Sequence, residues 1–579
     1  MNVKNKINMN NRVMKTTIGD NMNFTNKQRA RCTVVRPSRC ALMTTPSRSA
    51  VAVALALATF RACATDFDTG IPDLSVRWDN TVKYSAARRL EQPLPSLLGN
   101  PNTDDGDRNF HKGLISNRFD LFSELDVVYK NNMGFRLSGA GWYDPVYLRA
   151  NSNPGFAGGA VPNQTSVPYN EFPRKTREIH GRDAELLDAF VFGKFDVAGH
   201  NTTVRAGRHS LLWGESLFFG TNAISGGQMP VDAVKLVSVP NTQFKEAIRQ
   251  VPMLSGQFQI NAAMSVGAYV QFASSKVRAP AVGSYFSAID VAVDGAENLF
   301  TGSFAPRQKD REARRGGQGG LQFKLRDGDV DYGVYAIQFH DKGPQLVINL
   351  GPTGPTSYYQ AYHEGIRAFG ASVSRSFGDF NVASELSLRT NQDLASTRAV
   401  DLSAIVPVSP SNNSDNPAYA VGRTAHLNIS VIGIVPSTPL WREASLAAEF
   451  AWNRVLSVTR NPGATDPNAS RDGTAFRALF EPTYRAVLSG LDVGVPIGLG
   501  YAPKGSRPLF INGAGWIPEN GGDLTVGLNA VYLDAWRASL SYTHYYGPAS
   551  TTLDAAGHYG WRQNLKDRDF IAASVRYTF

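Results

Sequence analysis

The sequence predicts an all-β protein: one transmembrane antiparallel β-barrel of about 18 strands, with about 16 also compatible. Three observations support this prediction: apolar and polar residues alternate with period two, short turns alternate with long loops, and the last strand is amphipathic. No uncharged apolar stretch of about 18 residues follows residue 65, so the sequence after that point contains no candidate membrane helix.

The first 64 residues are predicted to be a leader that contains a secretory signal peptide. The apolar run Ala50–Phe60 follows several arginines and precedes a small-x-small pattern that ends at Ala64. This is the order of features in a signal peptide, and the run is too short to cross a bilayer. We therefore predict Met43 as the true start, cleavage after Ala64, and a barrel over residues 65–579. A short buried helix is the alternative reading.

The leader also explains the basic charge of the chain. Of 59 Lys and Arg and 49 Asp and Glu, eleven bases and one acid lie in residues 1–64, which leaves 48 of each in residues 65–579. A neutral body lacks the basic footprint of nucleic-acid binding, so nucleic acid is not an expected partner. All three cysteines precede residue 65, which excludes a disulfide scaffold or a thiolate zinc site in the mature chain.

The first hairpin shows the alternation clearly. Apolar residues such as Phe119 and Leu121 alternate with charged residues along both strands. Charges are costly in a dry core but tolerated in a hydrated lumen, so we expect the charged positions to face inward. These residues are Arg118, Asp120, Glu124, Asp126 and Arg136.

Connection lengths distinguish a membrane barrel from a soluble sandwich, which would show the same alternation. Short turns are expected near residues 130–134, 196–200, 327–329, 377–379 and 534. Long polar loops are expected near 87–114, 144–180, 209–253, 273–317, 390–421, 503–521 and 547–567. Outer-membrane barrels have short periplasmic turns and long extracellular loops. The predicted location is therefore the outer membrane of a Gram-negative bacterium.

The C-terminus provides an independent signal. Ile571, Ala573 and Val575 alternate with small or polar residues, and the pattern continues through Tyr577 to the terminal Phe579. A final amphipathic strand that ends in an aromatic residue resembles the signature by which the barrel-assembly machinery recognises bacterial outer-membrane proteins. An ordinary edge strand that ends in Phe is the alternative.

A motif in residues 204–254 resembles the proteobacterial family catalogued as domain of unknown function 1302. The pattern is R-x-G-R, W-G-E-S, P-x-D, K-E and a final proline. The matching residues are Arg205, Gly207, Arg208, Trp213, Gly214, Glu215, Ser216, Pro230, Asp232, Lys245, Glu246 and Pro252. The sequence departs from the family pattern at His209, where Gln is commoner, and over 223–229. The similarity extends from Phe67 to Phe579.

The resemblance implies an outer-membrane barrel more firmly than it implies a substrate. Genes of this family often neighbour those of an RND-type transporter and a periplasmic lipid-carrier-like protein, in settings linked to hydrophobic compounds. Both proteins are therefore possible partners, together with outer-membrane lipid, lipopolysaccharide and the barrel-assembly machinery.

The connection 209–253 is the candidate for a loop that folds into the lumen, because it is among the longest and follows the charged end of the strand Val204–Arg208. Its charged and aromatic residues would form a constriction that selects solutes. The alternative is an internal salt-bridge cluster that only holds the loop in place. The candidate residues are Arg205, Arg208, His209, Trp213 and Glu215.

No metal, cofactor or catalytic site is predicted. The acidic segment Asn102–Asp107 has enough oxygen ligands for Ca²⁺ but lacks a full calcium-loop pattern, so a surface turn is the default reading. Trp213–Ser216 does not complete the G-x-S-x-G pattern of a nucleophile elbow. The histidines are scattered, and no Ser/His/Asp spacing indicates a triad.

The predicted function is passive passage of small, hydrophobic or amphiphilic compounds across the outer membrane. The neutral charge argues against a strongly ion-selective pore. One alternative is a barrel that binds an RND-type transporter and a lipid carrier instead of conducting, and a second is a barrel-type hydrolase.

Overall fold

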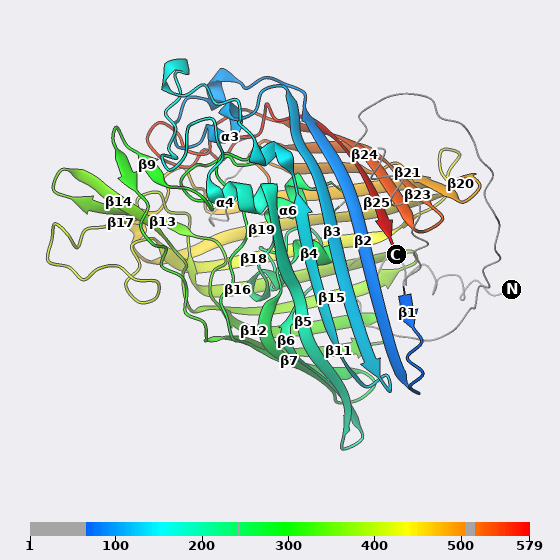
Figure 1. Cartoon of the computed structure of the whole chain (residues 1–579). Coiled ribbons are helices and arrows are strands. Elements are labelled where there is room, and N and C mark those ends of the chain that lie inside the picture. Colours follow the sequence, from blue (N-terminus) through cyan, green and yellow to red (C-terminus); the bar gives the residue numbers. More distant parts are fainter. Residues whose placement is uncertain (1–64, 241, 243, 504–515) are drawn as a thin grey trace, which may run out of the picture. The chain divides into compact units, whose positions relative to one another are not determined.

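The computed structural model describes residues 65–240, 242, 244–503 and 516–579. The predicted leader, with its start at Met43 and its cleavage after Ala64, lies outside the described residues. Asp66–Thr578 form one unit, and this unit is a closed antiparallel β-barrel (Figure 1). The predicted fold class is therefore confirmed.

Eighteen wall strands can be followed in the described part of the chain, and the barrel closes because β25 pairs with β2. In chain order they are β2 (Leu74–Arg89), β3 (Gly113–Tyr129), β4 (Met133–Tyr143), β5 (Arg182–Val197), β6 (His200–His209), β7 (Val251–Gln259), β8 (Met264–Gln271), β11 (Gln318–Asp327), β12 (Val330–Phe339), β15 (Ile366–Phe377), β16 (Phe380–Asp393), β18 (Val421–Val435), β19 (Glu443–Arg460), β20 (Asp472–Leu488), β21 (Leu491–Gly494) with β22 (Ile497–Ala502), β23 (Gly521–Tyr532), β24 (Trp536–Tyr546) and β25 (Phe570–Thr578). The segments β21 and β22 form one interrupted strand, since both pair with β20 and with β23.

The alternation in the sequence separates the two faces of the wall. On β16, Leu386 and Leu388 are each 50% exposed, whereas Glu385, Ser387 and Arg389 are buried. Apolar side chains thus cover the outer face and polar side chains line the inner one. A closed barrel leaves no unpaired strand edge, and its apolar exterior suits the hydrocarbon of a bilayer.

Long and short connections alternate along the chain, as predicted. The long ones are residues 90–112, 144–181, 210–250, 272–317, 340–365, 394–420, 461–471, 503–520 and 547–569. Two of them, 340–365 and 461–471, were missing from the sequence-based prediction. The first contains the hairpin of β13 (Gln345–Gly351) and β14 (Gly354–Ala361), whose strand-like sequence conceals the length of the connection.

The strand β1 (Thr65–Phe67) precedes β2, and the long connections carry the other remaining elements. Their short strands are β9 (Asn298–Phe300), β10 (Phe304–Pro306) and β17 (Val400–Asp401). The helical turns are η1 (Pro95–Leu97), α3 (Asp105–Arg108), η2 (Pro145–Leu148), η3 (Phe156–Gly158), α4 (Arg174–Thr176), η4 (Arg177–Gly181), α5 (Ser225–Gln228), α6 (Ala233–Ser238), α7 (Phe244–Ala247) and η5 (Pro462–Ala464). None of the helices in the described residues has the length and apolar character to cross a membrane.

The last strand lies where the two ends of the barrel wall meet. β25 pairs with β24 on one side and with β2 on the other. The ring of Tyr577 stacks on Trp536, with 4.4 Å between the ring centroids. Recognition of Tyr577 and Phe579 by the assembly machinery stays a prediction.

The exposed apolar face leads to a first testable prediction. Val334 lies midway along β12 and is 57% exposed on the outer face. We expect Val334→Arg to lower the free energy of unfolding by about 2–4 kcal/mol, because a guanidinium would then lie in hydrocarbon. Urea titration of the protein folded in lipid vesicles measures the change, with Val334→Leu as the control. Equal stability of the two variants would contradict a lipid-facing position.

Candidate functional site

The connection between β6 and β7, residues 210–250, lies against the inner side of the barrel wall. Trp213 packs on Tyr269 of β8 and on Tyr335 of β12, with ring centroids 5.0 and 6.3 Å away. Phe219 packs in a cluster with Ala451 of β19 and Ala475 of β20. These strands occupy distant positions around the barrel, so the connection extends across its interior.

Glu449 of β19 holds the first part of this connection. Its Oε2 accepts hydrogen bonds from three consecutive backbone N–H groups, those of Leu217 (3.0 Å), Phe218 and Phe219 (3.0 Å). Its Oε1 accepts a further bond from Asn428, at 2.7 Å. A segment without regular structure must find acceptors for its N–H groups, and one inward carboxylate supplies them here.

A second carboxylate and a guanidinium hold the next turn. Glu385 of β16 accepts from the backbone N–H of Glu215 at 2.9 Å and of Ile224 at 2.6 Å. Arg389, four residues further along β16 and on the same face, donates to the carbonyl oxygens of residues 221–223. The inner face of β16 therefore satisfies both donors and acceptors of the loop.

Ion pairs hold the part of the connection around α6. Lys235 contacts Glu185 of β5 at 2.7 Å, and Arg278 contacts the same carboxylate at 2.7 Å. Arg278 also pairs with Asp232 at 2.8 Å, and the Asp232 side chain accepts from the backbone N–H of Lys235 at the start of α6. Three separate segments of the chain meet at this cluster.

A cavity of about 340 Å³ lies between α6 with its following residues and the wall formed by β2, β3, β23, β24 and β25. Its apolar lining includes Leu236, Val237, Ile115, Phe286 and Phe570. Leu236 and Val237 are exposed, although they do not belong to the lipid-facing strands. The cavity thus presents an apolar surface inside the barrel.

Polar groups line the same cavity. The guanidinium of Arg118 pairs with Asp120 at 2.8 Å and lies over the ring of Trp142, 5.1 Å from its centroid. His180 of η4 is buried, and burial with the nearby Arg118 lowers its pKa to about 3. The neutral imidazole accepts a hydrogen bond from the backbone N–H of Ala281, which holds the ring in place.

The five charged residues of the first hairpin occupy the inner side of the wall and pair with one another. Arg118 Nη2 lies 2.8 Å from Asp120 Oδ1, and Arg136 Nε lies 2.6 Å from Asp126 Oδ1. Arg136 also approaches Glu124, at 3.9 Å. Arg118 lines the cavity; a role of the other four toward a solute stays a prediction.

The predicted constriction residues fall into two groups. The first group contacts β5 and β7. Arg205 lies over Phe190, Arg208 Nε donates to the carbonyl of Leu187 at 2.9 Å, and His209 shares a 2.8 Å hydrogen bond with the hydroxyl of Ser255.

The second group lies within the connection itself. Trp213 and Glu215 are held through their backbone N–H groups, by Gln228 at 2.7 Å and by Glu385 at 2.9 Å. That the two groups together form a constriction that selects solutes stays a prediction.

Sequence reasoning missed the residues that hold the connection, namely Glu385, Arg389, Asn428 and Glu449. The alternation places all four at inward positions, because the intervening residues of their strands are apolar. Polar residues at the inward positions of β16, β18 and β19 could therefore have been identified. Their partners in residues 215–224 could not, since nothing local relates the two regions.

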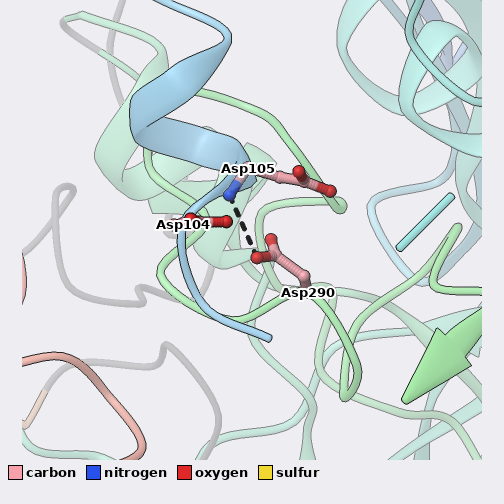
Figure 2. A group of neighbouring side chains, drawn as sticks. All are labelled: Asp104, Asp105 and Asp290. Atoms are coloured by element: carbon pink, nitrogen blue, oxygen red, sulfur yellow. Dashed lines mark hydrogen bonds between the residues drawn. The ribbon is translucent and has the colours of Figure 1, made fainter. Parts of the chain in front are cut away.

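An acidic cluster brings two long connections together (Figure 2). Asp104 and Asp105 come from residues 90–112 and Asp290 from residues 272–317, and their exposed fractions are 1%, 4% and 0%. The expected surface turn is therefore wrong, because the neighbouring connections cover it. Burial raises the pKa of Asp104 to about 6, and burial together with Asp104 raises that of Asp105 to about 7.

Comparisons with solved structures return several barrels. OccAB1 of Acinetobacter baumannii is 11% identical, with a TM-score of 0.40 over 87% of this chain and 96% of that one. OpdK of Pseudomonas aeruginosa, solved with vanillate, is 12% identical, with a TM-score of 0.37 over 87% and 98%. The outer membrane channel DcaP of A. baumannii is 9% identical, with a TM-score of 0.34 over 90% and 100%.

Among curated proteins no match to the chain is found. The family model described as Protein of unknown function (DUF1302) matches residues 45–579. This range includes the entire barrel and the motif of residues 204–254. The chain therefore belongs to the DUF1302 family.

Proposed function

We propose that this protein is an outer-membrane channel through which small amphiphilic molecules pass without an energy source of its own. The apolar exterior of a closed barrel supports a place in a bilayer, where every strand edge must be paired. Barrels of about 16–18 strands are wide enough to enclose an aqueous path. The connection 210–250 occupies part of that width and would decide what passes.

The observation that carries the proposal is the cavity beside α6. It combines exposed apolar side chains, Leu236 and Val237, with the guanidinium of Arg118 and the hydroxyls of Ser541 and Thr543. A ligand with an apolar body and a polar or anionic end would find a partner for each part. The volume of about 340 Å³ is that of a small-molecule site.

The experiment fills this cavity and measures flux. Ser541→Trp places an indole in the cavity, and we expect it to slow the entry of hexanoate into proteoliposomes strongly while glycerol entry falls less. Leu540→Trp is the matched control, because Leu540 is the neighbouring residue of β24 and is exposed on the outer face. Heat-modifiable mobility on gels checks that both variants fold.

Two outcomes would contradict parts of this proposal, the first the role of the cavity and the second conduction itself. Equal hexanoate flux through both tryptophan variants would remove the cavity from the path. Absence of any solute flux through the wild-type barrel, with co-purification of an RND-type transporter or a lipid carrier, would favour the alternative in which the barrel binds a partner instead of conducting.

A further inference from the structure

The acidic cluster is built from segments that are distant in the sequence. Asp104 and Asp105 lie at the start of α3, and Asp290 approaches from the connection 272–317 (Figure 2). One carboxylate oxygen from each residue lies within 4.8 Å of the others. Asp290 Oδ2 accepts from the backbone N–H of Asp105 at 3.0 Å, and Gln164 Nε2 donates to Asp105 at 3.4 Å.

The charges around the cluster do not balance. The connected groups are the five carboxylates of Asp104, Asp105, Asp107, Asp290 and Asp567 and the three guanidiniums of Arg89, Arg108 and Arg568. Arg108 pairs with Asp104 at 2.6 Å. Within the described residues no ion pair reaches Asp105 or Asp290. When all five carboxyl groups are ionised, two negative charges therefore lack a counter-charge among these groups.

Two buried oxygens of the cluster also lack partners. In the part of the chain that the structure describes, Asp104 Oδ1 and Asp290 Oδ1 accept no hydrogen bond. Their side chains are 1% and 0% exposed, so bulk water does not replace the missing donors. Leaving a buried charged oxygen unsatisfied costs more than leaving out a neutral one. The arrangement supplies oxygen ligands and negative charge, and it leaves these two oxygens without a donor.

We propose that Asp104, Asp105 and Asp290 bind one divalent cation, and that this cation is Ca²⁺. Its two positive charges match the two uncompensated carboxylates, and hard cations take carboxylate oxygens as ligands. Mg²⁺ usually keeps several of its waters, for which a site this deeply buried offers little room, whereas Ca²⁺ accepts irregular sets of protein oxygens. The cation would tie the connections 90–112 and 272–317 together, whether or not the barrel conducts solutes.

The test uses the full mature chain folded in detergent and stripped with EDTA. Ca²⁺ alone is titrated by calorimetry, and thermal unfolding is followed in parallel. We expect one saturable site per chain, a higher melting temperature with Ca²⁺, and a weaker response to Mg²⁺ at equal concentration.

Asparagine variants distinguish Ca²⁺ binding at this site from a general stabilisation of the protein by salt. Asp290→Asn keeps an oxygen that can accept from the N–H of Asp105, and Asp105→Asn keeps the side-chain size. We expect each to weaken Ca²⁺ binding by about tenfold or more, the loss that even outer-shell substitutions cause at metal sites. In EDTA each variant should melt at a higher temperature than the wild type, because repulsion is removed. Variants that merely misfold would melt lower.

Asp415→Asn, which changes an exposed acid of the connection 394–420, is the control and should leave Ca²⁺ binding unchanged. Absence of Ca²⁺ binding to the wild type would overturn the proposal, since the carboxyl groups would then be neutralised by protons. Equal Ca²⁺ affinity of the wild type and both asparagine variants would overturn it as well.

Discussion

Glu449→Ala will release the inner connection and raise the single-channel conductance of the barrel. The variant removes the acceptor of three consecutive N–H groups, those of residues 217–219, and the partner of Asn428. Unsatisfied buried groups cost about 1–3 kcal/mol each. Four donors lose their acceptor, so at the lower end of this range we expect the free energy that holds the segment in place to fall by about 4 kcal/mol in total. Planar-bilayer recording should show larger and noisier conductance than the wild type.

The matched control is Glu481→Ala. Glu481 on β20 is also an inward carboxylate, and it accepts from Asn529 of the wall at 2.9 Å. Its removal should leave the connection in place and the conductance close to that of the wild type. If Glu449→Ala and Glu481→Ala change conductance equally, the segment that Glu449 holds does not narrow the path.

Arg568→Met will loosen the long-loop end of the barrel. Arg568 is fully buried, contacts Asp107 at 2.9 Å, and donates to the carbonyl oxygens of Tyr285 and Ser287. Its loss leaves Asp107 with only Arg89 as a cationic partner in the described residues. Breaking a buried pair from one side costs about 3–5 kcal/mol. Hydrogen exchange should therefore show faster local opening of residues 90–112, 272–317 and 547–569.

An exposed pair provides the comparison for this variant. Arg326 pairs with Asp331 at 2.7 Å, and both side chains are about half exposed beside the turn between β11 and β12. Arg326→Met should change local stability by no more than about 1 kcal/mol, since water screens such pairs. Similar exchange rates in the two methionine variants would show that the buried network around Arg568 does not hold the connections.

The sequence by itself determined the wall of the barrel. Strand alternation has a period of two residues, so the outward leucines 386 and 388 and the inward Glu385 can be assigned from their order alone. The strands can be counted from the same alternation, and the predicted number of about 18 is confirmed. The hairpin β13–β14 was missed because a loop that contains strands has the same period as the wall.

Only the tertiary structure decided what occupies the interior. Glu385 lies 161 residues from Ile224, Glu449 lies 232 residues from Leu217, and Asp290 lies 185 residues from Asp105. The alternation in the sequence predicts the face of the sheet on which a side chain lies. It does not predict which distant backbone group that side chain contacts. Closure of the barrel brings these groups together. The acceptors of the inner connection and the buried acidic cluster therefore follow from the fold, and the face of each strand follows from the sequence.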